Sequence, residues 1–249
     1  MWPLAGMALF LAVWQTAALL IGADYILPGP RAVLGALIGN MPLLLRHSAY
    51  TLQEALYGLA IAVVFAAALT ALLTLSARLK SMLYPLLLAS QMVPIIVLAP
   101  LFIIWFGFGM LPKVLVVILV CFFPMVISML SGLMAADAET VAFYRSMGMS
   151  GWQLFHLLRW PLALPYFFGG LRIAVTYSVM GAVIGEWLGA TGGLGLLLTR
   201  SKNTYNLTLT FAVIIMIILW SALLFAIVKL AEYKALAWQR QVGEENWGN

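Results

Sequence analysis

The chain has 249 residues, of which 65% are hydrophobic and only 8% are charged. A soluble domain typically carries about a quarter charged residues, so this composition could not cover a soluble surface without large apolar patches. The net charge of +5 does not indicate a nucleic-acid partner, because the basic residues are scattered between apolar runs. A disulfide framework is excluded by the single cysteine, Cys121, and a histidine metal site is disfavoured because His47 and His156 lie in different polar gaps. The composition therefore predicts an all-α integral membrane protein.

Apolar runs predict about six transmembrane helices in one domain that covers residues 1–249. The first run, Leu4–Ile21, is interpreted as a span rather than a signal peptide, because no Lys or Arg precedes Arg31. A turn at 27–30 then introduces a short surface helix, Arg31–Gly39, with Pro30 at its first position. The further spans are expected at Ser48–Leu75, Tyr84–Trp105, Leu111–Leu133, Pro165–Leu188 and Leu207–Leu230.

The basic residues orient these spans. Six spans place both ends of the chain on one side, and Lys and Arg accumulate on the cytoplasmic side of membrane proteins. With cytoplasmic ends, the inner set is Arg78, Lys80, Arg145, Arg159, Arg172, Lys229, Lys234 and Arg240, and the outer set is Arg31, Arg46, Lys113, Arg200 and Lys202. This distribution favours cytoplasmic ends, and it places the gap between spans four and five in the cytoplasm.

That gap, residues 135–161, predicts a bent helical elbow. Asp137 suits the N-cap of a first helix, which Gly148 can end in a left-handed conformation. Ser150 and Gln153 fit the capping box of a second helix, which is expected to end before Pro161. From the residues alone, two interpretations stay open: the elbow packs against its own bundle, or it docks onto a soluble partner as an amphipathic helix.

The elbow resembles the EAA loop of bacterial binding-protein-dependent ABC importer permeases. Gly148 and Pro161 fall at the spacing of that motif, with Leu158 and Trp160 at its intervening apolar positions. The Glu-Ala-Ala positions hold Ala142-Phe143-Tyr144, so the acidic residue of the motif is missing. The turn at 27–34 is similar to the periplasmic turn of the nitrate, sulfonate and taurine branch.

The resemblance implies a type I ABC importer permease in the bacterial inner membrane, with the elbow as the element that couples to an ATPase. It implies these coupling residues: Ala142, Phe143, Tyr144, Arg145, Gly148, Ser150, Trp152 and Pro161. No lysine follows a glycine, so the chain has no P-loop, and ATP-Mg is expected to bind to a separate ATPase chain. The implied partners are an ATPase pair, a second permease copy or a sister chain, and a periplasmic or lipid-anchored solute-binding protein.

Four residues are candidates for the translocation path. Ser90, Gln91 and Pro94 combine polar side chains with a helix breaker inside span three, although hydrogen bonding between helices is an alternative role. Glu186 is an ionisable group near the outer end of span five, where it could contact the solute, anchor the interface or act as a gate. Glu54 is expected to pair with Arg46 or His47, and the glycines at 192–195 are expected to form a flexible external turn.

Other functions are less well supported by the residues. An ion-coupled secondary transporter usually has an acidic or histidine relay at mid-span, and a membrane enzyme needs a convergent catalytic set; the sequence shows neither. The segment 181–189 is similar to permeases for the hydroxymethylpyrimidine precursor of thiamine. The resemblance leaves sulfonate, nitrate and riboflavin open as alternative solutes.

Overall fold

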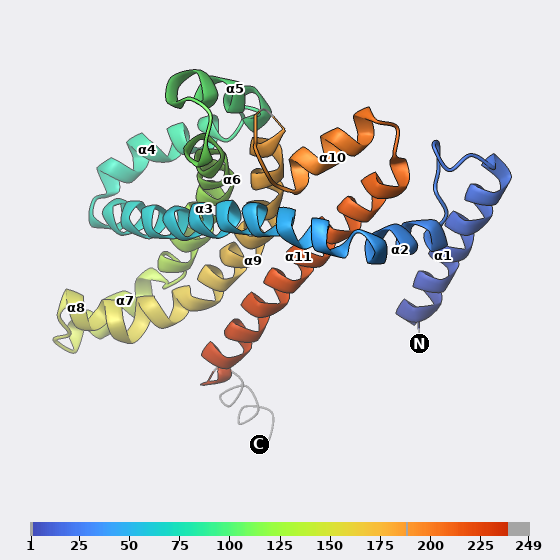
Figure 1. The fold of residues 1–249 in the computed structure, drawn as a ribbon. Coiled ribbons are helices and arrows are strands. Elements are labelled where there is room, and N and C mark those ends of the chain that lie inside the picture. The colour runs from blue at the N-terminus through green and yellow to red at the C-terminus, as the bar shows by residue number, and fades with distance from the viewer. Residues whose placement is uncertain (1, 188, 239–249) are drawn as a thin grey trace.

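The structure, a computed structural model, describes residues 2–187 and 189–238. The regular secondary structure of the described residues consists of helices, which are joined by short turns and loops (Figure 1). The helices are α1 (Trp2–Ile21), α2 (Pro30–Gly39), α3 (Met41–Leu75), α4 (Ala77–Ser90), α5 (Ile95–Phe106), α6 (Met110–Leu133), α7 (Ala138–Ser146), α8 (Gly151–Leu154), the π-helical turn η1 (Phe155–Arg159), α9 (Trp160–Glu186), α10 (Leu194–Asn203) and α11 (Leu207–Ala235).

Five stretches of helix in the described residues are long and apolar enough to cross a membrane, and a bent pair of helices makes a possible sixth. The five are α1, α3, α6, the run from α8 to α9, and α11. In Figure 1 the start of α1, the end of α11 and the elbow point to one side, whereas α10 and the α5–α6 connection lie on the other. This arrangement agrees with the predicted six-span layout.

The predicted third span is not a continuous helix. Its residues form α4 and α5, which meet at an angle of 94° across residues 91–94. Pro94 explains the break, because it lacks an N–H and disfavours helical geometry at the residue before it. Pro85 and Pro100, by contrast, are accommodated inside α4 and α5.

The predicted break before Pro161 is wrong. Helix continues from Gly151 to Glu186, through the π-helical turn η1 and into α9. In η1 the Trp160 N–H donates to the carbonyl of Phe155, five residues earlier, which widens the turn just before Pro161. Pro161 then occupies the first turn of α9, where a missing N–H is tolerated. The elbow is therefore continuous with the fifth span, whose predicted last residue, Leu188, lies outside the described residues.

Three long helices, α3, α6 and α9, form the centre of the molecule, and glycines let them approach closely. A Cβ atom on Gly181 of α9 would lie 2.7 Å from Val120 of α6, and one on Gly58 of α3 would overlap Val117. The buried cluster between these helices includes Cys121 and Met125. Because lipid provides no hydrophobic drive for helix association, such small-residue contacts supply van der Waals packing instead.

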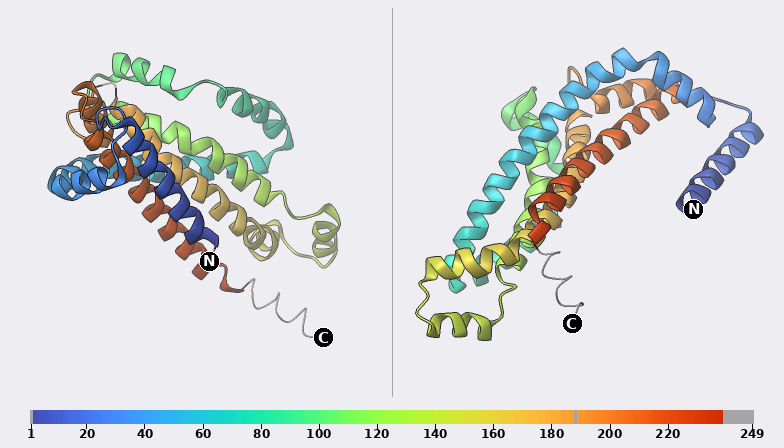
Figure 2. Two further views of the ribbon diagram at one scale, coloured as in Figure 1. Left: turned by 90° about the vertical axis from the view of Figure 1, so that its right-hand side faces the viewer. Right: turned by 90° about the horizontal axis from the view of Figure 1, so that it is seen from below.

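Helix α1 diverges from this centre at the edge of the molecule (Figures 1 and 2). Trp14 ties it to the rest, through a 3.1 Å hydrogen bond from Nε1 to the carbonyl of Pro28 and a ring contact with Phe211. Most of its described side chains are exposed, as expected for a helix that faces lipid.

We expect Gly58→Ala to destabilise the protein by about 1–3 kcal/mol, because the added methyl group would overpack the α3–α6 contact. The measurement is the thermal unfolding midpoint of the purified protein in detergent. Gly35→Ala in α2 is the matched control, since its Cβ would meet no atom within 4 Å. Equal midpoints for the two variants would contradict close packing at Gly58.

Candidate functional site

The first half of the elbow is a short capped helix. The Asp137 carboxylate accepts a hydrogen bond from the backbone N–H of Thr140, as the sequence predicted for an N-cap. Hydrogen bonds from Thr140 hold the pKa of Asp137 below its ordinary value, with the side chain of Thr140 making the larger contribution and its backbone N–H the smaller one. Glu139 in the first turn and Arg145 in the last turn both complement the helix dipole.

The bend of the elbow has the predicted geometry. Gly148 adopts a φ of +83°, in the left-handed region that favours glycine, and its N–H donates to the carbonyl of Arg145 at 3.0 Å. Ser150 and Gln153 form the complete capping box, in which each side chain accepts from the backbone N–H of the other residue. The bend is thus fixed by local hydrogen bonds.

The elbow does not pack into its own bundle. Helix α7 has no buried residue, and Figure 2 shows the elbow protruding from the end of the α6–α9 pair. Phe143, Met147 and Trp152 are 61%, 63% and 72% exposed. Of the predicted coupling residues, the exposed ones are Ala142, Phe143, Arg145, Gly148, Ser150 and Trp152, and the half-buried ones are Tyr144 and Pro161.

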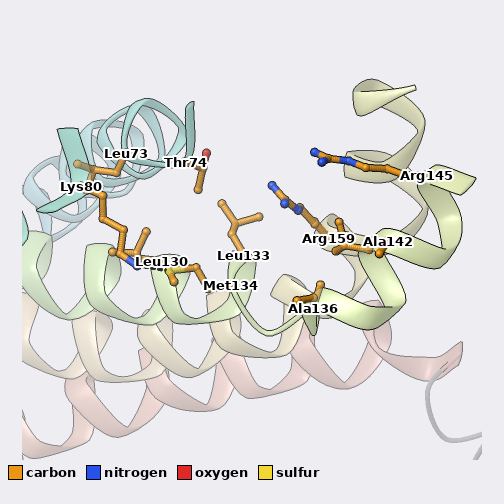
Figure 3. A pocket seen from close by; sticks show the side chains of 12 residues that line it. Leu73, Thr74, Lys80, Leu130, Leu133, Met134, Ala136, Ala142, Arg145 and Arg159 are labelled. Carbon is orange, nitrogen blue, oxygen red and sulfur yellow. Dashed lines mark hydrogen bonds between the residues drawn. The ribbon is translucent and has the colours of Figure 1, made fainter. Parts of the chain in front are cut away.

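A basic cavity of about 710 Å³ lies between the elbow and the α3–α4 turn. The Arg145 and Arg159 side chains extend into it, and Lys80 reaches toward it from α4 (Figure 3). Lys80 Nζ donates to the sulfur of Met134 at 2.8 Å. Arg159 Nε is buried and finds no hydrogen-bond partner within residues 2–187 and 189–238. Of the described residues that line the cavity, none is acidic. This cavity could not be predicted from the sequence, because its cations come from separate segments.

The break between α4 and α5 brings two of the four predicted path residues to one cavity. Ser90 and Gln91 line a space of about 450 Å³ together with Tyr177 and Met180 of α9. Pro94 lies just beyond, as the N-cap residue of α5. The Ser90 hydroxyl donates to the carbonyl of Leu87 within its own helix.

Glu186 lies apart from that cavity, in a buried hydrogen-bond network at the far end of α9. Its side chain is fully buried, and its two carboxylate oxygens accept from the Thr51 hydroxyl at 2.7 Å and the Gly195 N–H at 2.5 Å. Thr51 also accepts from the N–H of Leu194 at 2.8 Å. The N–H groups of Leu194 and Gly195 belong to the first turn of α10, where backbone N–H groups lack partners within the helix. Glu186 and Thr51 therefore cap α10 from α9 and α3.

The glycine turn before α10 is not the flexible external turn that the sequence analysis expected. Residues 192–195 are all buried. A Cβ atom on Gly193 would overlap the carboxylate of Glu186, and one on Gly195 would overlap the carbonyl of Val183. His47 Nδ1 lies 3.1 Å from the Gly193 nitrogen and 2.8 Å from its oxygen, so it also holds this turn. The glycines are needed for close packing.

Glu54 does not pair with Arg46 or His47, contrary to expectation. Helix α3 begins at Met41, so these residues are about two turns, or roughly 10–12 Å, away from Glu54 along the helix. Glu54 instead forms an ion pair with Lys113 of α6, in which both side chains are buried. A sequence clue existed, because Ser48, Thr51 and Glu54 recur every three residues and form a polar stripe on an apolar helix.

Comparison with known proteins identifies the architecture. Residues 58–235 match the family model described as the binding-protein-dependent transport system inner membrane component. The fold is similar to a chain of the MetNI methionine ABC transporter in inward-facing conformations, with a TM-score of 0.62 at 19% identity, over 79% of this chain and 96% of that one.

Curated relatives extend over nearly the whole chain. The formylaminopyrimidine transport permease protein ThiX of Halalkalibacterium halodurans is 36% identical over 234 residues, which is 94% of each chain. The riboflavin transport system permease protein RibX of Chloroflexus aurantiacus is 33% identical, over 96% of this chain and 91% of the relative. The taurine transport system permease protein TauC of Escherichia coli is 28% identical, over 97% of this chain and 94% of the relative.

Glu186→Ala should destabilise the protein by about 2–4 kcal/mol, because it leaves the Thr51 hydroxyl and the Gly195 N–H buried without an acceptor. Glu186→Gln keeps an acceptor oxygen and should cost less. Thermal unfolding in detergent measures both. The control is Glu232→Ala, which removes a partly exposed ion pair with Arg172 and should cost less than about 1 kcal/mol. A Glu186→Ala midpoint no lower than that of the control would refute the capping role.

Proposed function

Since this chain belongs to the family of binding-protein-dependent transport system inner membrane components, and is the permease subunit of an ABC importer, we propose that its elbow is the docking surface for a separate ATPase chain. The protein is a multi-pass protein of the bacterial inner membrane, and its relatives are transport permeases. In the proposed orientation the elbow faces the cytoplasm, where the ATPase binds ATP-Mg.

The exposed apolar surface of the elbow is the observation that carries this proposal. Phe143 and Trp152 are large side chains on two short helices that extend beyond the bundle. Outside the bilayer such a surface is unfavourable in water, so it marks a site of protein contact. Short amphipathic helices typically bind by inserting their apolar face into a groove of the partner.

The basic cavity beside the elbow supports the same role and suggests which charges the ATPase presents. Arg145 stands on α7 next to the exposed apolar residues, and Arg159 lies at the end of η1. The acidic residue of the EAA motif is missing here, and the elbow presents a basic residue instead. We therefore propose that the permease contributes the positive charge, Arg145, and that the ATPase contributes acidic side chains.

The continuous helix from Gly151 to Glu186 provides the mechanical link. A movement of the elbow is transmitted to α9 without an intervening hinge loop, and α9 packs tightly on α6 through Gly170 and Gly181. Packed helices of this kind switch between discrete arrangements instead of deforming continuously. Closure of an ATPase pair on ATP would tilt α6 and α9 together. This would shift the equilibrium between the inward-open and the outward-open permease only if ATP binds more tightly to one of the two states.

The solute path is proposed to pass the bend between α4 and α5. There Ser90 and Gln91 face a cavity at a point where Pro94 interrupts the helix. Broken backbone at membrane depth is tolerated where it lines a cavity or is buried in protein. A second permease copy, proposed as a homodimer partner, would complete the path. Glu186 is proposed to act on this path only indirectly, by holding α10 in place.

A small nitrogen heterocycle is the proposed solute. The relative with the highest identity among those described above is named for formylaminopyrimidine transport, and it aligns over 94% of the chain. Riboflavin and taurine are the solutes named for the other two. An aminopyrimidine, such as the hydroxymethylpyrimidine precursor of thiamine, is therefore proposed as the solute that a binding protein delivers.

Phe143→Asp should uncouple transport from ATP hydrolysis, because a charge would replace an apolar docking side chain. In proteoliposomes that contain the assembled importer, we expect solute uptake and stimulation of the ATPase by loaded binding protein to fall about tenfold or more, the size of a strong interface contact.

The matched control is Phe143→Leu, which keeps an apolar side chain at the same position and should retain most of the activity. Because Phe143 is exposed, both variants should fold and insert normally, which thermal unfolding can verify. Wild-type coupling in the Phe143→Asp importer would overturn the assignment of the elbow.

The proposed solute class can be tested on the binding protein that works with this permease. A thermal-shift screen of that purified protein should show stabilisation by aminopyrimidines at concentrations well above the dissociation constant, because a ligand stabilises the state that binds it. Riboflavin, nitrate and taurine are the comparison ligands. Stabilisation by one of these alone would replace the aminopyrimidine with that solute and leave the importer mechanism unchanged.

A further inference from the structure

The basic cavity beside the elbow lies at the level where two membrane spans end. Its lining includes Thr74, the last residue of the apolar stretch in α3, and Leu133, the last residue of the apolar stretch in α6. Lys80 reaches it from α4, directly after the first of these spans (Figure 3). A span ends where the hydrocarbon core of the bilayer gives way to lipid headgroups. The cavity is therefore within reach of the headgroups of one leaflet.

The three cations of the cavity have no anionic partner. Lys80, Arg145 and Arg159 take part in neither of the ion pairs found within residues 2–187 and 189–238. Lys80 donates to the neutral sulfur of Met134, which leaves its positive charge uncompensated. Like charges around one space repel one another, and an anion that enters the space relieves this repulsion. Because Lys and Arg are donors only, the cavity selects an anionic ligand that is rich in oxygen acceptors.

The rest of the lining is mostly apolar, and much of it is accessible. Met134, Ala138 and Ala142 are exposed, and Val141 is half-buried. A free phosphate ion would leave this apolar wall in contact with water.

The size of the cavity also indicates a ligand larger than a simple anion. Its volume of about 710 Å³ lies well inside the range of sites that hold whole organic molecules. A phospholipid offers both a phosphate for the cations and hydrocarbon for the apolar wall. Basic pockets between membrane helices on the cytoplasmic side bind the headgroups of anionic lipids in this way.

We propose that this cavity is a binding site for an anionic phospholipid, whose phosphate is held by Lys80 and Arg159 and whose glycerol and upper acyl chains cover the apolar wall. Arg145 is exposed on α7 and stays available for the ATPase contact proposed above. The bound lipid bridges the α3–α4 turn and the elbow, and it thereby braces the elbow against the bundle. The site goes beyond the proposed importer function, because it requires neither a solute nor ATP.

Native mass spectrometry of the assembled importer in detergent, titrated with phosphatidylglycerol, tests the site. Phosphatidylcholine, whose phosphate is balanced by a cation, and inorganic phosphate are the comparison ligands. We expect a saturable phosphatidylglycerol site on each permease copy and much weaker binding of phosphatidylcholine. Equal binding of the two lipids would overturn the proposal. Displacement of the lipid by an equal concentration of inorganic phosphate would also overturn it, because the cavity would then select a free anion.

The double variant Lys80→Gln/Arg159→Gln should weaken phosphatidylglycerol binding about 25-fold, since each cation near an anionic lipid contributes about fivefold. The matched control is Arg78→Gln/Lys229→Gln, which removes two exposed cations that do not line the cavity. The control should change the affinity less than about twofold, because exposed charges at a distance are screened by salt. Equal losses in the two double variants would show only a general attraction of lipid to basic protein, and they would overturn the site.

Lys80→Gln alone keeps the proposal testable if the double variant does not fold. Lys80 is half-buried at the start of α4, and its only hydrogen bond within the described residues is the one to Met134, so its replacement should leave the fold intact. Lys80→Gln should lose about fivefold in affinity for phosphatidylglycerol, whereas Lys80→Arg, which keeps the charge, should bind like the wild type. Wild-type affinity in a folded Lys80→Gln variant would overturn the assignment.

Acidic side chains of the ATPase are the other candidate occupant of the cavity, and assembly separates the two. Phosphatidylglycerol binding is therefore measured on the full-length permease alone and on the assembled importer. A lipid site predicts the same affinity in both, because the ATPase then contacts the outer face of the elbow. If the permease alone binds the lipid and the assembled importer does not, the ATPase fills the cavity and the lipid proposal is overturned, whereas the docking role of the elbow stands.

Discussion

Polar groups that lie within a bilayer must be satisfied inside the protein, and this constraint shapes the structure from its centre to its ends. The clearest case is the start of α10, where Glu186 and Thr51 supply acceptors to N–H groups that the helix itself leaves unpaired. A carboxylate from α9 and a hydroxyl from α3 thus accept hydrogen bonds from the first turn of a third helix, α10. The buried glycines of that turn follow from the same arrangement, because side chains there would overlap the carboxylate.

The same constraint explains how the irregular elements are placed. The break between α4 and α5 faces a cavity with polar groups. The π-helical turn η1 accommodates Pro161 at the start of α9 without ending the helix. The result is a stiff helix that joins the elbow to the fifth span. Glycine contacts let α9 pack closely on α6, so in the proposed mechanism the two helices move together as the lever.

The two ends of the molecule differ in chemistry. The elbow end combines exposed apolar side chains with a cavity lined by cations, which suits a protein partner with acidic groups. The opposite end holds buried polar pairs between helices, Glu54 with Lys113 and Glu186 with Thr51.

Many local features could be predicted from the sequence because they depend on residues close together in the chain. The Asp137 N-cap, the left-handed Gly148 and the Ser150–Gln153 capping box are of this kind, and all three are confirmed. The number of spans could be predicted from the apolar runs. The family could be predicted from the resemblance of the elbow, with Gly148 and Pro161, to the EAA loop.

The tertiary structure decided what depends on contacts between spans. The sequence predicts a partner for Glu54 in its own helix and a flexible turn at residues 192–195, and both predictions are wrong. The actual partners, Lys113 and Glu186, meet these residues only when α3, α6, α9 and α10 are packed together. The continuity of the helix through Pro161 also escaped prediction, since a proline alone indicates a break and the widened turn that accommodates it depends on backbone geometry. The sequence by itself therefore determined which segments enter the membrane and where the elbow bends, and only the packed helices decided which polar groups meet.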